Sequence, residues 1–225
     1  MTRLRPPTTV LLALLVTGPA AAQNLLANPT FDCAPSGTHP PGWLTPDLQT
    51  TCDPTNDADG NPSSGSAVRT TSTFTPHFEL VAWQIVPVTP GETYFYKASF
   101  LLSPSDTEVS AQLVVNWMNA TSCFVEVFPR PPEAVVTTPG SWVPTATLSA
   151  VAPPDTACAR IALFHVFEGP GTATLHADNV FFSLGPIVDI PTLSPVAFGL
   201  EAFLILLAAG WHLRRARHRT TIAAR

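Results

Sequence analysis

The sequence predicts an all-β domain, folded as an antiparallel β-sandwich, with export segments at both ends. Apolar and polar residues alternate with a period of two in stretches such as residues 93–102 and 108–118, as in strands with one buried face. Turns rich in proline and glycine separate these stretches, and the chain contains 25 prolines. No helical period is visible between the two ends, so two packed antiparallel sheets are expected.

The domain is expected over residues 23–184, and its first part is poor in strands. Residues 24–32, Asn-Leu-Leu-Ala-Asn-Pro-Thr-Phe-Asp, are expected to form a short first strand that Pro29 breaks. Prolines and an acidic run make further strands rare over residues 33–65. A Pro-Gly pair within this region predicts a turn that presents Trp43 to the core.

Strand signals sharpen from residue 78 onward, where β-branched and aromatic residues become frequent. Tyr94 and the following even-numbered residues to Leu102 are expected to share one face of a strand. In the next strand, the odd-numbered residues from Ala111 to Trp117 are expected to share a face. The expected strands cover residues 66–71, 80–88, 93–102, 108–118, 124–128, 142–152, 159–167 and 172–183.

The N-terminus has the three parts of a secretory signal peptide over residues 1–22. Arg3 and Arg5 supply the basic region, residues 10–16 supply the apolar core, and three alanines precede the expected cleavage site. The apolar core is too short to cross about 30 Å of hydrocarbon. Export is therefore expected, with this segment removed.

The C-terminus predicts a membrane anchor. Residues 196–213 are mostly Ala, Leu, Phe and Ile, which is just long enough for a transmembrane helix. Residues 214–225 form a basic tail that is expected to stay cytoplasmic. A linker over residues 185–195 joins the domain to this helix.

The linker contains a short motif made of Ile190, Pro191, Thr192 and Leu193. Motif, apolar span and terminal arginines together resemble the IPTL C-terminal sorting signal of Gram-negative bacteria. The resemblance implies processing by an exosortase-like transpeptidase and delivery to the cell surface or matrix. The protein is therefore expected in the cell envelope, anchored in the membrane before any C-terminal processing.

Four cysteines lie between the two export segments, which predicts disulfides in an exported chain. Three pairings are possible, and the pairing of sequence neighbours, Cys33 with Cys52 and Cys123 with Cys158, is preferred. Zinc is the competing interpretation, but the chain has no C-x-x-C motif and no histidine at ligand spacing.

The charge distribution excludes nucleic acid as a partner. Between Asp32 and Asp189 the chain has four basic residues and 15 acidic ones, a net charge of −11. Such a domain repels the phosphate backbone and anionic lipid.

Several short motifs follow one another in a defined order. Residues 24–32 come first, then Gly-Ser-Ala-Val-Arg at 65–69 and Gln-Ile-Val-Pro-Val-Thr-Pro-Gly-Glu-Thr-Tyr at 84–94. Ser-Trp, Pro-Pro-Asp, Ala-Arg-Ile-Ala-Leu and Ala-Asp-Asn-Val complete the series. Together they resemble the jelly-roll carbohydrate-binding modules of the galactose-binding-domain-like superfold. The resemblance implies a jelly roll, whereas fold alone does not determine a ligand.

The same resemblance implies a structural calcium site between the first and last strands. The matching carboxylates are Asp32 and Asp178, and backbone carbonyls near Gly65 and Ser66 would add ligands, since calcium takes six to eight oxygens. Two ordinary loop carboxylates are the alternative. The acidic run within residues 53–61 does not match an EF-hand and is expected to be a solvated loop.

A sugar site needs aromatic faces that stack on the rings and planar polar groups that bond hydroxyls. If Ile161 and Leu163 face the core, strand alternation directs their neighbours to the opposite face of the sheet. The candidate ligand-binding residues are Phe95, Lys97, Gln112, Asn116, Trp117, Arg160 and Phe164. A polar sheet face without a ligand is the alternative, and Trp43, Trp83 and Trp142 are expected in the core.

No enzyme is expected, because the chain has no Gly-x-Ser-x-Gly motif and no pair of carboxylates on opposed elements. The sequence predicts an exported, surface-anchored, non-catalytic module that binds carbohydrate or an extracellular matrix polymer. The alternative is a structural surface or matrix protein without a small-molecule ligand. Structural calcium is the one cofactor considered.

Overall fold

The computed structural model describes residues 23–33, 39–61, 64–105, 108–119, 121 and 123–186. The signal peptide, the sorting motif at residues 190–193, the apolar span and the basic tail lie outside these residues. Within the described part of the chain every regular element is a strand, and no helix there could cross a membrane.

Two antiparallel sheets form a β-sandwich. The six-stranded sheet contains β1 (Thr51–Asp53), β2 (Ser66–Thr73), β11 (Gly171–Leu184), β4 (Thr93–Leu102) and β8 (Trp142–Pro144) in this order, and β9 (Leu148–Val151) also pairs with β4. The five-stranded sheet contains β3 (His77–Pro87), β10 (Thr156–Phe167), β5 (Val109–Asn119) and β6 (Glu126–Val127), and β7 (Ala134–Val136) also pairs with β5.

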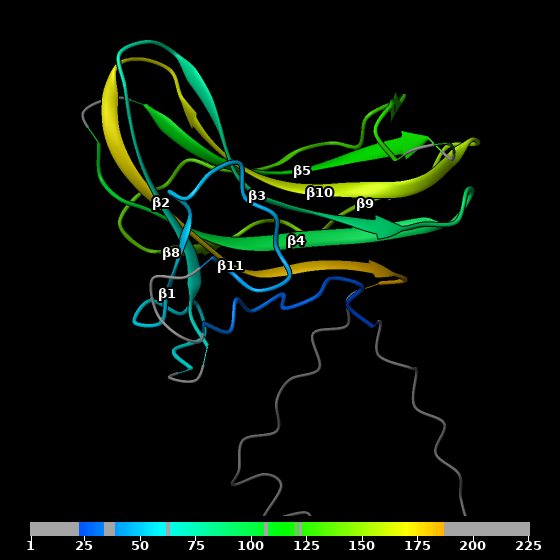
Figure 1. Cartoon of the computed structure of the whole chain (residues 1–225), viewed down its shortest axis with the longest axis horizontal. Helices are drawn as coiled ribbons and strands as arrows, with labels where there is room; N and C mark the ends of the chain where they lie inside the picture. The colour runs from blue at the N-terminus through cyan, green and yellow to red at the C-terminus, as the bar shows by residue number, and fades with distance from the viewer. Residues whose placement is uncertain are drawn as a thin grey trace, which may run out of the picture. The chain divides into compact units, whose positions relative to one another are not determined.

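The strands from β2 to β5 alternate between the two sheets, as in a jelly roll. β2 and β4 belong to one sheet and β3 and β5 to the other, and the last two strands, β10 and β11, are likewise divided. Figure 1 shows β5 and β10 in one layer, with β4 and β11 in the layer that faces it. The prediction of an antiparallel sandwich is confirmed.

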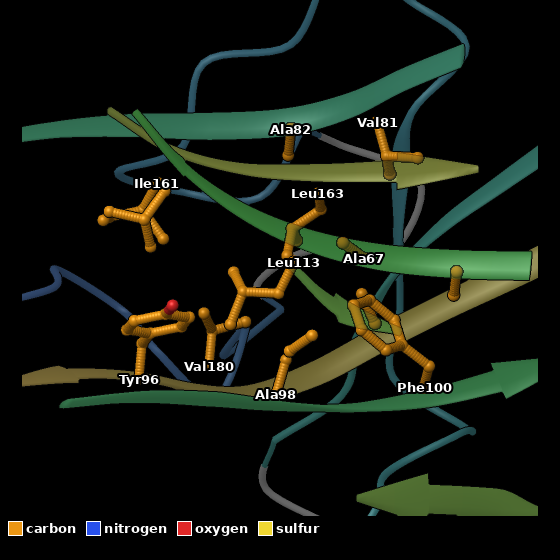
Figure 2. Packing of buried hydrophobic residues seen from close by; sticks show 14 of the residues in the cluster. Ala67, Val81, Ala82, Tyr96, Ala98, Phe100, Leu113, Ile161, Leu163 and Val180 are labelled. Carbon is orange, nitrogen blue, oxygen red and sulfur yellow. The ribbon is translucent and has the colours of Figure 1, made fainter. Parts of the chain in front are cut away.

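The core lies between the two sheets. Ile161, Leu163 and Leu113 of the five-stranded sheet are fully buried and point toward the opposite layer (Figure 2). Tyr96 and Phe100 of β4 meet them from the other side. The predicted alternation is confirmed in both strands: even-numbered residues of β4 and odd-numbered residues of β5 up to Trp117 face the core.

Residues 24–32 do not form the expected strand. They make one isolated bridge, between Asn24 and Ser183, and then turn. Pro29 removes a donor, and Asn28 and Phe31 have positive φ angles of 45° and 47°, which a strand cannot contain. The segment still lies along the last strand, since the Val180 N–H donates to the Pro29 carbonyl at 2.9 Å.

Several other elements differ from the sequence prediction. The region expected to be poor in strands contains β1, and residues 142–152 divide into β8 and β9. The strand expected over residues 124–128 shortens to β6, and β7 was not predicted. Short edge strands carry little hydrophobic period, so the pattern does not reveal them.

Two disulfides join the sequence neighbours, Cys33 to Cys52 and Cys123 to Cys158, and the preferred pairing is confirmed. Each closes a loop whose chain-entropy contribution is about 3–4 kcal/mol. The first disulfide passes close to the backbone of Gly65, where a Cβ atom would lie 2.7 Å from Cys33 Sγ. Glycine is therefore needed at this position.

Trp43 anchors the first loops to the core, as expected. It is 5% exposed, its ring stacks on Phe31 with centroids 4.8 Å apart, and its Nε1–H donates to the Asn28 carbonyl at 2.9 Å. The predicted turn before it is present, with Gly42 at a φ of 81°. Trp83 and Trp142 are only half-buried.

His165 is a buried polar residue that lacks a hydrogen-bond partner. The side chain is 0% exposed, neither ring nitrogen is hydrogen-bonded to any residue that the structure describes, and the ring packs on Phe167 with centroids 4.4 Å apart. Burial, with a smaller contribution from the charge of Arg69, lowers the pKa of His165 to about 4.

We expect His165→Leu to stabilise the protein by about 1–2 kcal/mol at pH 7, because it removes buried polar atoms that have no partner. Since the folded-state pKa lies below the ordinary 6.5, the unfolded state binds the extra proton between these values. The free energy of unfolding of the wild type should therefore decrease as the pH falls from 6.5 to 4. Urea unfolding across this range measures both effects, and an equal pH dependence in the variant would contradict the assignment.

Candidate functional site

A pocket of about 210 Å³ opens on the outer face of the five-stranded sheet. Its lining residues come from β3, β5, β10 and the segment after β6: Phe78, Gln112, Val114, Asn116, Arg130, Glu133, Arg160 and Phe164. Four of these, Gln112, Asn116, Arg160 and Phe164, were selected from the sequence. The structure brings these four together in one place.

The pairing of β5 with β10 explains why these side chains meet. Arg160 lies opposite Asn116 in the register, and Phe164 lies opposite Gln112. All four are on the face that points away from the core, because the residues that alternate with them, Leu113, Val115, Ile161 and Leu163, are buried between the sheets. The prediction that Arg160 and Phe164 point to the sheet face opposite Ile161 and Leu163 is confirmed.

Apolar side chains form one side of the pocket. Phe164 is half-buried, Val114 is 9% exposed, and Phe78 is 67% exposed, although aromatic residues usually lie in the core. Two phenyl rings at an open pocket offer flat faces to a ligand.

A chain of polar contacts forms the other side. Arg160 Nε and Nη2 donate to Asn116 Oδ1 at 3.3 and 3.0 Å, and Asn116 Nδ2 donates to Glu126 Oε1 at 2.6 Å. Arg130 Nε and Nη2 hold both oxygens of Glu126 at 2.6 and 2.7 Å. The hydrogen bond from Arg130, followed by that from Asn116, lowers the pKa of Glu126. Asn116, at 3% exposure, is thereby held in one orientation between an anion and a cation.

The sequence did not indicate four of the lining residues, Phe78, Val114, Arg130 and Glu133, nor Glu126 as the partner of Arg130. The predicted disulfide was the signal that could have found the charged ones. Because Cys123 is bonded to Cys158, two residues before Arg160, the segment that follows Cys123 must start close to the end of β10 that carries Arg160. Arg130 also packs over Phe128, with its guanidinium 5.5 Å from the ring centroid.

The structure separates the remaining candidates from this pocket. Phe95 and Lys97 face outward, as expected, but they belong to β4, in the other sheet. Trp117 is 1% exposed and packs in the core, 5.9 Å from the ring of Tyr94. None of the three lines the pocket.

Asp178 is buried and lies near other carboxylates. It is 0% exposed, and its oxygens accept hydrogen bonds from the N–H groups of Ala58 at 2.9 Å and Asn179 at 2.6 Å. Burial raises the pKa of Asp178 to about 7; the two N–H groups oppose this rise, and the nearby carboxylates of Asp57 and Asp59 add to it. Carboxylate oxygens with excess negative charge suit a hard cation in charge and donor type.

The other expected calcium ligand is placed differently. Asp32 is exposed, and its Oδ1 accepts a hydrogen bond from the Thr30 hydroxyl at 3.2 Å. Among the residues that the structure describes, no three His, Cys, Asp or Glu side chains lie close enough together to hold a metal ion. The calcium site therefore stays a prediction, and its donors would centre on Asp178.

A second pocket, of about 510 Å³, lies beside the start of β3, but its charged side chains are paired with one another. Arg69, 3% exposed, donates to both oxygens of Asp47 at 2.7 and 3.0 Å and also pairs with Glu79. The hydrogen bond from Arg69 lowers the pKa of Asp47. This cluster fastens a loop to β2 and β3.

No protein-family model and no curated protein sequence matches the chain. Solved structures do match it. The apo form of a cyclase from Fischerella sp. is 12% identical, with a TM-score of 0.50 over 76% of this chain and 100% of that one. The enzymatically active domain of a bacteriophage CBA120 tailspike protein is 16% identical, with a TM-score of 0.49 over 72% of this chain. This chain covers only 21% of that tailspike chain.

A CBM22-1 xylan-binding domain from Paenibacillus barcinonensis is 14% identical, with a TM-score of 0.48 over 74% of this chain and 97% of that one. At such identities the similarity concerns the arrangement of the strands alone. The strand topology of the chain itself therefore defines the fold as a β-sandwich, and the geometry of its own pocket has to indicate what it binds.

Proposed function

We propose that the protein is a non-catalytic module that binds a glycan in the pocket on the outer face of the five-stranded sheet. One observation carries this proposal: two phenyl rings, Phe78 and Phe164, stand beside the planar polar groups of Gln112, Asn116 and Arg160 in one open pocket. Apolar ring faces and fixed planar donors are the two features that recognise a pyranose.

Each side chain of the pocket would have a different role in binding. The phenyl ring of Phe164 would pack against the apolar face of a sugar ring, while Phe78, at the rim, would cover the next one. The Gln112 amide makes no hydrogen bond within the described residues and would exchange hydrogen bonds with sugar hydroxyls. Asn116 already uses both ends of its amide within the protein, so its role is to position Arg160.

Phe164→Ala should weaken glycan binding by about tenfold or more, because it removes the stacking surface. Phe95→Ala is the matched control: it removes a half-exposed phenyl ring from the opposite sheet and should leave affinity unchanged. Affinity gel electrophoresis with a panel of neutral and acidic polysaccharides measures the effect.

Melting temperatures of both variants should stay near that of the wild type. If no polysaccharide retards the wild-type domain, the glycan proposal is wrong. A structural surface or matrix protein without a small ligand would then remain. Equal losses of affinity in Phe164→Ala and Phe95→Ala would mean that the pocket is not the site.

We further propose that the module is exported and displayed at the cell surface. The signal peptide over residues 1–22 and the segment from residue 190 to the terminal arginines support this. An exosortase-like enzyme would process the C-terminal segment, which would otherwise anchor the protein in the membrane.

Intact-mass analysis of the protein from the envelope of cells that make it should show a mature chain that begins at Gln23. Processing at the sorting motif would also remove residues 196–225, whereas retention would leave the chain ending at Arg225. A mature chain that still begins at Met1 would contradict export by this signal.

Calcium is proposed as a structural ion held by Asp178, with backbone carbonyl oxygens as further ligands, as the family resemblance implies. Without a cation, the raised pKa means that the folded state binds a proton between pH 3.8 and about 7 that the unfolded state has lost. This contribution to stability is lost as the pH rises through about 7. A bound cation would replace the proton above that pH.

Calcium added to chelator-treated protein should therefore raise the melting temperature more at pH 8 than at pH 6, since the proton competes with the ion. Asp178→Asn should abolish the increase. Asp32→Asn shows whether the exposed carboxylate is also a ligand, as the family resemblance implies. An unchanged melting temperature on adding calcium at pH 8 would refute the site.

A further inference from the structure

We infer that the glycan recognised by this pocket is acidic, and that Arg160 binds a carboxylate of a uronate residue. This inference rests on the proposed glycan-binding function and names the class of ligand. Its basis is a guanidinium in the pocket that no carboxylate of the described chain neutralises directly.

No carboxylate of the described chain bonds directly to Arg160, although its charge, after the hydrogen bonds from Arg130 and Asn116, also helps to lower the pKa of Glu126. Glu126 is the acidic group linked to it, but Asn116 stands between the two and donates to Glu126 while it accepts from Arg160. The two oxygens of Glu126 are meanwhile held by Arg130. Glu126 is thus already paired, and Arg160 bonds within the described protein only to a neutral amide oxygen.

The surroundings of Arg160 reduce the hydration of its guanidinium, which costs free energy unless a ligand supplies an anion. Arg160 is half-buried, and Phe164 and Val114 line the same pocket. A cation beside apolar groups loses hydration, which an anion can replace by charge-assisted hydrogen bonds. Arg160 Nη1, which donates to no described residue, is the group left to meet one oxygen of a carboxylate.

One acidic side chain in the pocket lining disfavours an acidic ligand. Glu133 lines the pocket, is exposed, and makes no ion pair within the described residues. Its charge is screened by solvent more strongly than that of a half-buried guanidinium. Glu133 should therefore weaken the binding of an acidic sugar slightly without reversing the preference.

The pocket also holds a single sugar ring more readily than an extended chain, at about 210 Å³. A uronate placed with its ring on Phe164 would direct its carboxylate along the β5–β10 pair toward Arg160, because the two side chains lie four residues apart on one face of β10. The aromatic and cationic groups are thus arranged for one acidic residue of a polymer.

The test compares alginate, polygalacturonate and hyaluronan with their carboxyl-reduced forms, using isothermal titration calorimetry on the domain. At least one acidic polymer should bind about tenfold or more tightly than its reduced form, the usual gain from a charge-assisted pair. Arg160→Gln should abolish the preference, Arg160→Lys should retain part of it, and Glu133→Gln should increase it about twofold. Phe95→Ala, on the other sheet, should change nothing.

Reduced forms that bind as tightly as the acidic polymers would overturn the inference and leave the glycan proposal standing. A second measurement needs no polymer. The protein is titrated with glucuronate and with glucose, and the Nε–H signal of Arg160 is followed by nuclear magnetic resonance spectroscopy. Glucuronate should shift this signal and glucose should not. Equal responses to both sugars would overturn the inference, whether or not any polysaccharide binds.

Discussion

The position of β10 between β3 and β5 is the constraint on which both the core and the candidate site depend. Ile161 and Leu163 are buried against the opposite sheet, so Arg160 and Phe164 must point the other way. A slip of one residue in the pairing would exchange these two sets and expose the core residues. The hydrophobic effect that fixes the register therefore also fixes the pocket, and no separate interaction is needed to aim its side chains.

Asn116 adds specificity to this register. Its amide bonds an anion at one end and a cation at the other, so a rotation about its last torsion would set like polar groups against each other. The hydrogen bonds link β5 and β10 to the segment that carries Glu126 and Arg130, which the disulfide to Cys158 also ties down. A preorganised wall of this kind loses little conformational entropy when a ligand binds.

Strand alternation predicted the direction in which each side chain points. It did not predict to which sheet each strand belongs. Phe95 and Lys97 face outward as predicted, yet they lie on the opposite sheet from Arg160, because a period of two says nothing about strand order. The sequence did not predict Phe78 as a site residue because it lies before the strand expected over residues 80–88. It did not predict Arg130 because this residue lies in a loop. The even number of cysteines in a chain expected to be exported did predict the disulfides, from which the place of that loop could have been inferred.

The charges of the protein would act on an acidic ligand in two ways, by repulsion at long range and by attraction at contact with Arg160. The domain has a net charge of −11 between Asp32 and Asp189, which repels an acidic polymer as it approaches. At physiological ionic strength this repulsion is screened beyond about 8 Å, whereas a contact between a carboxylate and half-buried Arg160 is screened much less. Salt should thus weaken the repulsion more than the attraction. An acidic glycan bound here would differ in this respect from a polyanion bound by a basic surface, whose affinity falls as salt rises.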